Sequence, residues 1–184
     1  MSIVDTAVAG VGFVPEDRKS EGLYLSLSIA QNIALGALRL MPLWRKANVK
    51  TSLIDNLTAR MRVRAASTSQ TVGSLSGGNQ QKVMIGRWLA SGVDVLLVEE
   101  PTRGVDVGAK SEIYGLLREF ANGGGAVLIV SSELTEILGL CDRILVVRGG
   151  DIVAELAGEA TTEEEIMRFA LPGTARADAP EAVS

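Results

Sequence analysis

The chain has 184 residues, of which 47% are hydrophobic and 4% aromatic, so we expect one domain with a core built from aliphatic side chains. Lys+Arg 18 against Asp+Glu 22 gives a net charge of −4, which argues against the basic surface of a nucleic-acid-binding protein. A single cysteine, Cys141, excludes an internal disulfide; we expect a small buried apolar residue and a reducing compartment. No apolar run reaches the ~18 residues of a membrane span, which predicts a soluble chain.

The first half of the chain predicts one short strand followed by helices. Residues 11–14 have the pattern of a strand that Pro15 ends, because proline has no N–H to donate. We expect Ser28 to cap one helix and Asn48 to cap another. In the second of these helices an apolar residue recurs at every fourth position, which predicts one buried face. These positions are Val49, Leu53, Leu57 and Met61. Together with the helix that follows, the segment predicts a small helical subdomain at about 24–91.

The second half alternates strand and helix patterns, which predicts an α/β fold. Two apolar runs, 95–100 and 126–132, have the composition of strands buried on both faces of a parallel sheet. Gly149 and Gly150 predict the turn of a hairpin. Thr161 and Thr162, which precede three glutamates, are expected to begin a final helix. Helices are expected at about 79–89, 108–121, 133–140 and 163–170. The last residues, 172–184, have the composition of a disordered tail.

The stretch LSGGNQQKV, residues 75–83, places flexible residues directly before a helix. A helix N-terminus presents unpaired N–H groups and a partial positive charge, which suits it to bind phosphate. Glycine lets the backbone approach the anion closely, and Ser76 adds a hydroxyl donor. An ordinary glycine-containing helix start explains the nonapeptide equally well, so both interpretations stay open on this stretch alone.

The stretch VLLVEEPTRGVD, residues 95–106, places two carboxylates at the end of a buried strand. In open α/β sheets, ligands bind at the carboxyl ends of strands. Glu99 and Glu100 at this position suit metal binding and general-base catalysis. One carboxylate would hold Mg²⁺ or its water shell, and the next would polarise a nucleophilic water. The alternative is a solvated loop that begins before Pro101.

Together these stretches resemble the ATPase domains of the ABC family. The resemblance extends from about Val11 to Met167 and is strongest to the second nucleotide-binding domain of bacterial sugar importers of the ribose, galactose and xylose type. PEDRKSEGL, LSGGNQQKV, EPTRGVDVGAK and SSELTEILGLCDRILV carry it. It implies an α/β, partial P-loop-NTPase-like (ABC ATPase) core over 1–171. A helical subdomain at 24–91 would contain the signature helix, and 92–171 would form the remaining core.

The resemblance also implies a signature motif that touches the γ-phosphate of ATP bound by the opposite domain. Its nucleotide-binding residues would be Leu75, Ser76, Gly77, Gly78 and Asn79, with Gln80 directly after them.

Further roles are implied for the residues around the strand ends. Glu100 stands at the position of the catalytic glutamate, a general base, and Glu99 at the Walker B position that serves the metal. Asp106 ends the D-loop, Glu16 occupies the Q-loop position near the permease, and Ser132 stands where many members carry a switch histidine.

As a family member, the chain would be an ATP-binding component of an importer for sugars or similar small polar solutes, with ATP and Mg as cofactors. The implied partners are a second nucleotide-binding domain, transmembrane permease subunits and, indirectly, a periplasmic solute-binding protein, with no nucleic acid. The implied location is the cytoplasmic face of the bacterial inner membrane, as a peripheral protein.

Three departures from the family pattern qualify this function. Glu99 replaces the usual aspartate, and a positioning error of about 1 Å can cost roughly a hundredfold in rate. Ser132 replaces the switch histidine. No Walker A motif, G-x-x-x-x-G-K-[ST], occurs in the 184 residues. We therefore expect the chain alone not to bind and hydrolyse ATP, and we expect exposed apolar strand edges with poor solubility.

Two alternatives remain beside the importer subunit. The first is a non-catalytic fragment of a split or decayed gene that acts only as an interaction module. The second is the ATPase head of a DNA-repair protein, against which the absence of heptads and of a basic stripe argues.

Overall fold

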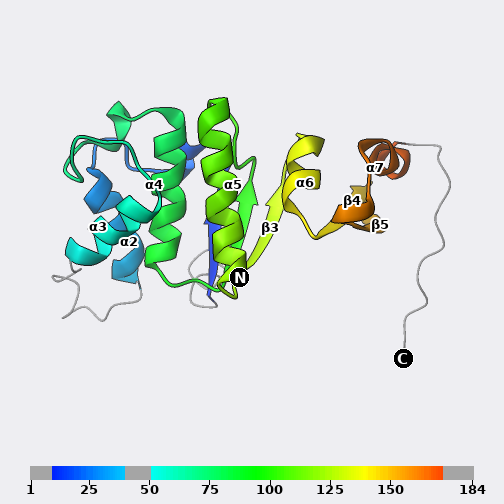
Figure 1. The fold of residues 1–184 in the computed structure, drawn as a ribbon, viewed down its shortest axis with the longest axis horizontal. Helices are drawn as coiled ribbons and strands as arrows, with labels where there is room; N and C mark the ends of the chain where they lie inside the picture. The colour runs from blue at the N-terminus through cyan, green and yellow to red at the C-terminus, as the bar shows by residue number, and fades with distance from the viewer. Residues whose placement is uncertain (1–9, 40–50, 172–184) are drawn as a thin grey trace. The chain divides into compact units, whose positions relative to one another are not determined.

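The computed structural model describes residues 10–39 and 51–171 (Figure 1). The chain divides into two compact units, Met1–Val130 and Ser131–Ser184, and each is described by itself. The predicted boundary at residues 91/92 does not coincide with this division and stays a prediction. The predicted cap at Asn48, the predicted face position Val49 and the predicted tail at 172–184 lie outside the described residues.

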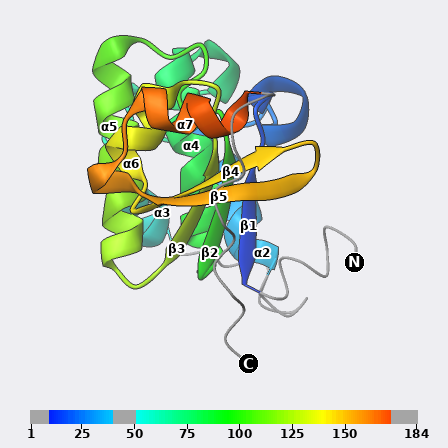
Figure 2. The same ribbon diagram turned by 90° about the vertical axis from the view of Figure 1, so that its right-hand side faces the viewer.

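The strands of the first unit form a three-stranded parallel sheet (Figure 2). Its strands follow one another across the sheet in chain order, and Val14 pairs with Val98 while Glu99 pairs with Val130. The first strand ends before Pro15, as expected. The carboxyl ends of all three strands therefore meet at one edge, which is where the acidic residues lie. The strands are β1 (Val11–Val14), β2 (Val95–Glu99) and β3 (Ala126–Val130).

Two helices cover one face of this sheet, α4 (Gly77–Ala90) against β1 and α5 (Val107–Asn122) against β3. Gly12 faces α4 so closely that a Cβ atom there would lie 2.9 Å from the Trp88 ring. On the opposite face, Leu128 is 54% exposed and Val130 60% exposed. The prediction that this strand is buried on both faces is therefore wrong, because α5 covers only one face of β3 in the described part of the unit.

The helical segment of the first unit begins with a short π-helical turn, η1 (Arg18–Gly22), and a helix, α2 (Ile29–Arg39). Ser28 caps α2, as predicted: its hydroxyl accepts from the Gln31 N–H at 3.1 Å, and the Gln31 side chain accepts from the Ser28 N–H at 2.9 Å. This reciprocal pair is a capping box.

The next helix, α3 (Thr51–Arg60), buries a face that differs partly from the predicted one. Leu57 and Met61 are buried, as expected, whereas Leu53 is exposed and Ile54 is buried in its place. The reason is geometric, because a helical turn holds 3.6 residues and a strict spacing of four drifts off the buried face. A 3₁₀ turn, η3 (Val72–Ser74), leads from this region into α4.

The second unit is a hairpin packed on helices. Its turn uses two glycines in the left-handed region, Gly149 (φ +62°) and Gly150 (φ +94°), as a tight hairpin requires. Thr162 caps the last helix by accepting from the Glu165 N–H, which confirms the predicted start. Cys141 packs, partly buried, against the core of this unit. The elements are α6 (Leu134–Leu140), β4 (Arg143–Arg148), β5 (Asp151–Ala157), η4 (Gly158–Ala160) and α7 (Glu163–Ala170).

Candidate functional site

The start of α4 carries a hydroxyl that is held in a defined orientation. Ser76 is the N-cap residue, with extended backbone, and its side chain does not cap the backbone N–H groups of the helix. Its Oγ accepts from Asn79 Nδ2 at 3.0 Å, and the Asn79 Oδ1 accepts from the Arg64 N–H at 2.9 Å. Within the described residues, the Ser76 hydroxyl is an acceptor only, so its proton stays available to donate. Asn79 thus orients the hydroxyl rather than extending from the helix.

The two glycines of this motif also serve packing inside the chain. A Cβ atom on Gly77 would lie 2.7 Å from the Gly104 carbonyl oxygen, and one on Gly78 would lie 2.4 Å from the Ala109 Cβ. Any larger residue would force α4 away from the start of α5. The sequence reasoning invoked glycine only for the approach of a phosphate, and the structure adds this second, internal requirement.

Gln80 is directed inward and is only 5% exposed. Its Nε2 donates to the carbonyl oxygens of Val72 and Leu75, both at 3.2 Å, and its Oε1 accepts from Arg18 Nε at 3.3 Å. Gln80 therefore binds the loop before α4 to the helix itself. Leu75, at 9% exposure, packs into the core beside it.

The acidic pair stands where the chain leaves the sheet. Glu99 is the last residue of β2, and the Glu100 N–H still donates to the Val130 carbonyl at 2.8 Å. Glu100 has a φ of +44°, a conformation uncommon for residues other than glycine and frequent at functional sites. Both side chains are partly exposed at the carboxyl edge of the sheet. The geometry thus presents two carboxylates at the edge where ligands of such sheets bind.

The remaining predicted residues occupy different places. Asp106 caps α5, because its Oδ1 accepts from the Ala109 N–H at 3.0 Å. Glu16 forms an ion pair with Arg103, which joins the loop after β1 to the loop after β2. Ser132 lies in the second unit, whereas Glu100 lies in the first.

The acidic pair fits a magnesium ion for which it supplies one or two ligands, while phosphate and water supply the others. Glu99 and Glu100 offer carboxylate oxygens, and within residues 10–39 and 51–171 no group of three potential metal-ligating side chains gathers. Mg²⁺ is commonly bound through one or two carboxylates, with substrate phosphates and water as its other ligands. The donor set therefore suits magnesium that arrives with a nucleotide.

A buried ion pair, which the sequence reasoning missed, connects α4 with α5. Lys82 is 1% exposed, and its Nζ donates to Glu112 Oε2 at 2.8 Å and to the Arg62 carbonyl at 2.6 Å. Arg64 approaches the other Glu112 oxygen at 3.0 Å. The hydrogen bond from Lys82 lowers the pKa of the Glu112 carboxyl. The sequence does hold a signal, since Lys82 precedes the apolar run VMI on a helix.

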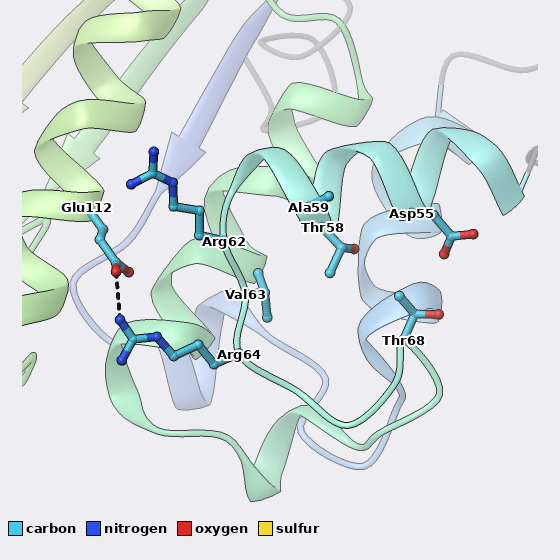
Figure 3. Close-up of a pocket in the computed structure, with 8 residues that line it drawn as sticks. All are labelled: Asp55, Thr58, Ala59, Arg62, Val63, Arg64, Thr68 and Glu112. Atoms are coloured by element: carbon cyan, nitrogen blue, oxygen red, sulfur yellow. Dashed lines mark hydrogen bonds and ion pairs between the residues drawn. The ribbon is translucent and has the colours of Figure 1, made fainter.

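This ion pair lies at the edge of an open pocket of about 630 Å³ (Figure 3). Figure 3 shows the Arg64 guanidinium directed at Glu112 from the loop after α3. The charged groups at this edge are therefore already engaged with one another. The lining residues are Asp55, Thr58, Ala59, Arg62, Val63, Arg64, Thr68 and Glu112.

Comparisons with known proteins find similar sequences and similar folds. The family model described as "ABC transporter" matches residues 4–103. The chain is 53% identical over 169 residues to the "Ribose import ATP-binding protein RbsA 2" of Rhizobium meliloti, covering 90% of this chain and 33% of that protein. It is 46% identical over 167 residues to the "Arabinose import ATP-binding protein AraG" of Rhizobium etli, covering 89% and 33%. The chain thus spans about a third of the length of these relatives.

Solved structures share the fold at low identity. A nucleotide-free ATP-binding cassette from an ABC transporter superposes with a TM-score of 0.71 at 20% identity, over 92% of this chain and 68% of that one. A dimeric post-hydrolysis cassette bound to ADP and Pi superposes with a TM-score of 0.68 at 20% identity, over 88% and 69%. The expected cassette fold, a partial ABC ATPase core, is therefore confirmed. In the described part of the chain, no helix has both the length and the apolar character that crossing a membrane requires.

Proposed function

The chain belongs to the ABC transporter family, and from this premise we propose that it supplies the signature helix (α4) and the Walker B strand (β2) of an importer's ATP-binding subunit. The proposed cargo is a sugar or a similar small polar solute, as the names of the ribose and arabinose relatives suggest. The observation that carries the proposal is the start of α4, where the Ser76 hydroxyl, hydrogen-bonded to Asn79, lies at the N-cap position beside the first backbone N–H groups of the helix.

In this proposal the start of α4 binds the γ-phosphate of ATP held by an opposite domain. The first N–H groups of a helix have no partners within it and carry partial positive charge. The Ser76 hydroxyl accepts from Asn79, which leaves its proton for a phosphate oxygen. A donor that is fixed before the anion arrives needs no reorganisation on binding.

The acidic pair supplies the chemistry at the sheet edge of the same chain. Magnesium bound with the nucleotide would neutralise phosphate charge there. Glu99 would hold this ion through its water shell, and Glu100 would accept a proton from the attacking water as general base. The left-handed backbone at Glu100 directs the chain out of the sheet directly after Glu99. Ser132 is proposed at the switch position, and Asp106 and Glu16 are proposed to act near the nucleotide through the loops that they stabilise.

We further propose that the 184-residue polypeptide does not hydrolyse ATP by itself. The sequence printed here contains no Gly-Lys pair followed by serine or threonine, and the phosphate cradle of such a motif is a principal part of P-loop catalysis. The proposed partners are a second nucleotide-binding domain, permease subunits and, indirectly, a periplasmic binding protein. The proposed site of action is the cytoplasmic face of the inner membrane.

The experiment is a comparison of two serine variants in the assembled transporter, reconstituted in vesicles. Ser76→Ala removes the proposed phosphate donor, and Ser52→Ala removes an exposed serine of α3. A hydrogen bond to a charged group is worth about 1.5–3 kcal/mol, so Ser76→Ala should lower the ATPase rate about 10- to 100-fold while Ser52→Ala leaves it unchanged. Equal rates for the two variants would contradict the proposal.

The non-catalytic interaction module is the second candidate, and the absent Gly-Lys pair favours it. Adding a polypeptide that carries the phosphate loop of the same transporter separates the two. ATPase activity that appears on mixing supports the importer subunit, whereas stable binding without activity supports the interaction module.

A further inference from the structure

One arginine joins three segments around the start of α4. Arg18 is the first residue of η1, in the segment that follows β1. Its Nε donates to Gln80 Oε1 at 3.3 Å, its Nη1 to the Arg103 carbonyl at 2.8 Å and its Nη2 to the Gly104 carbonyl at 3.3 Å. These acceptors lie 62, 85 and 86 residues away along the chain. A single guanidinium therefore ties the turn after β1 to the signature helix and to the loop after β2.

The turn that carries Arg18 is itself fixed. Asp17 caps it, accepting from the backbone N–H groups of Lys19 at 2.9 Å and Ser20 at 3.3 Å. A hydrogen bond from the Ser20 side chain, with these backbone bonds, lowers the pKa of the Asp17 carboxyl. A second link runs beside it, the ion pair between Glu16 and Arg103. The same short turn thus contacts the loop after β2 twice.

Arg18 also sits close against the signature glycine. A Cβ atom on Gly77 would lie 2.7 Å from Arg18 Nη2 as well as from the Gly104 oxygen. A cation at a helix N-terminus is electrostatically unfavourable, because the helix end carries partial positive charge. The hydrogen bonds to the three acceptors therefore hold the guanidinium in this place, although the partial positive charge of the helix end repels it.

The planar fork of arginine is what this arrangement uses. Its donors diverge in a fixed plane, so one side chain can reach a side-chain amide and two successive carbonyls at once. The ammonium of lysine is a point charge with donors on one atom, so it keeps the charge but cannot span the three acceptors.

We propose that Arg18 is a positioning residue, which locks the start of the signature helix against the Arg103–Gly104 loop and ties both to the segment 16–22. The consequence for catalysis rests on the proposed function. A displacement of 16–22 would then move Ser76 and the loop before α5 together, and not one after the other.

Amide hydrogen exchange on the full chain tests directly whether Arg18 holds the start of α4 and the Arg103–Gly104 loop in place. The reporter amides are those of Gln80 and Val105, which donate to the Ser76 and Thr102 carbonyls, and amides of β2 are the internal reference. In Arg18→Met and in Arg18→Lys, exchange at both reporters relative to β2 should rise about tenfold.

The matched control is Arg60→Met, which removes an exposed arginine paired with Glu119 in the same unit. In this variant the reporter ratio, which is the exchange rate at Gln80 and Val105 divided by that of β2, should not change. Reporter ratios that stay unchanged in Arg18→Met would overturn the proposal. Normal ratios in Arg18→Lys would also overturn it, because charge alone would then suffice. A general loss of stability raises exchange at the reporters and at β2 equally, so it leaves the reporter ratio unchanged. An unchanged ratio therefore counts against a positioning role for Arg18.

A second readout addresses the consequence for the transporter. Solute-stimulated ATPase activity divided by unstimulated activity does not depend on the folded fraction. In the assembled transporter we expect this ratio to fall about fivefold in both Arg18 variants and to stay constant in Arg60→Met. Constant ratios in the Arg18 variants would contradict the proposed coupling. If the unsubstituted transporter shows no solute stimulation, the proposed function fails, and the exchange experiment still decides the role of Arg18.

Discussion

Replacing Lys82 with methionine should destabilise the first unit more than any loss of a surface charge. The side chain is 1% exposed and donates to Glu112 at 2.8 Å and to the Arg62 carbonyl at 2.6 Å. Methionine fills the space of the aliphatic stem but has no donor. The variant therefore leaves Glu112 without its buried partner, and it leaves the Arg62 carbonyl without the lysine donor.

The magnitude follows from the burial of the pair. Removing one partner of a buried ion pair costs about 3–5 kcal/mol. The Glu112 side chain is 18% exposed and keeps Arg64, whose side chain is 80% exposed. Since this exposed arginine offsets part of the loss, we expect the low end, about 3 kcal/mol. The control Arg60→Met breaks a pair with side chains 49% and 51% exposed and should cost only about 0.2–1 kcal/mol.

Urea unfolding monitored by tryptophan fluorescence measures this cost. Trp88 lies on α4 and is 9% exposed, so its emission reports the first unit. Trp44 is replaced by phenylalanine in every variant, so that Trp88 alone is observed. The free energy of unfolding of Lys82→Met is then compared with that of Arg60→Met in this background.

A double variant separates the ion pair from simple packing. Glu112→Gln removes the charge that Lys82→Met leaves uncompensated, so the double variant should lose at least about 1 kcal/mol less than the two single losses added together. Strictly additive losses, or a cost of Lys82→Met no larger than that of Arg60→Met, would show that the Lys82–Glu112 ion pair does not stabilise the first unit.

Acid should reduce the difference between the unsubstituted chain and Lys82→Met. The pKa of Glu112 in the folded chain is lowered, first by the Lys82 hydrogen bond, from its ordinary value of 4.5. A lowered folded pKa gives stability that is complete above the unfolded pKa and is lost as pH falls through the folded pKa. The difference in the free energy of unfolding should therefore be constant near pH 7 and shrink below about pH 4.5. A difference that stays constant to pH 3 would exclude the ion pair as its source.

Three further substitutions have defined outcomes. Gly78→Ala places a Cβ atom 2.4 Å from that of Ala109 and should cost about 1–3 kcal/mol by overpacking in the Trp88 unfolding assay. Gly115→Ala, in open space on α5, should instead stabilise by up to about 1 kcal/mol in the same assay; an equal effect of both would contradict the packing argument. Thr162→Ala removes the cap of α7 and should cost about 1 kcal/mol of helix stability. This cost should appear as faster amide exchange in α7, and unchanged exchange would mean that the cap does not stabilise the helix.

Local patterns in the sequence were enough to predict most of the elements. The strand at 11–14 ends before Pro15, and the caps at Ser28 and Thr162 form as expected, because each depends on residues within one turn. The buried face of α3 shifted from Leu53 to Ile54, because helical periodicity is not an integer. The exposure of Leu128 and Val130 was not predictable, since an apolar run does not show how many faces of a strand are covered.

The sequence predicted the motifs of the candidate site, but it did not predict the residues that hold these motifs in place. The signature stretch and the acidic pair are short and contiguous, so their chemistry can be inferred from residue types in order. Arg18 and the Lys82–Glu112 pair act across 30 to 86 residues of chain, and a single sequence gives no distance between such positions. The packing role of Gly78 against Ala109 is hidden for the same reason.

If the start of α4 faces a nucleotide held by a partner domain, as proposed, bound nucleotide should protect a thiol placed there from modification. A thiol is introduced by Ser76→Cys, with Ser52→Cys as the control, in a Cys141→Ser background. In the assembled transporter, Mg-ATP should slow modification of the thiol at position 76 by about tenfold or more, because bound phosphate excludes the reagent, and should leave position 52 unaffected. Modification at position 76 that proceeds at the same rate with and without Mg-ATP would mean that the start of α4 does not bind the nucleotide.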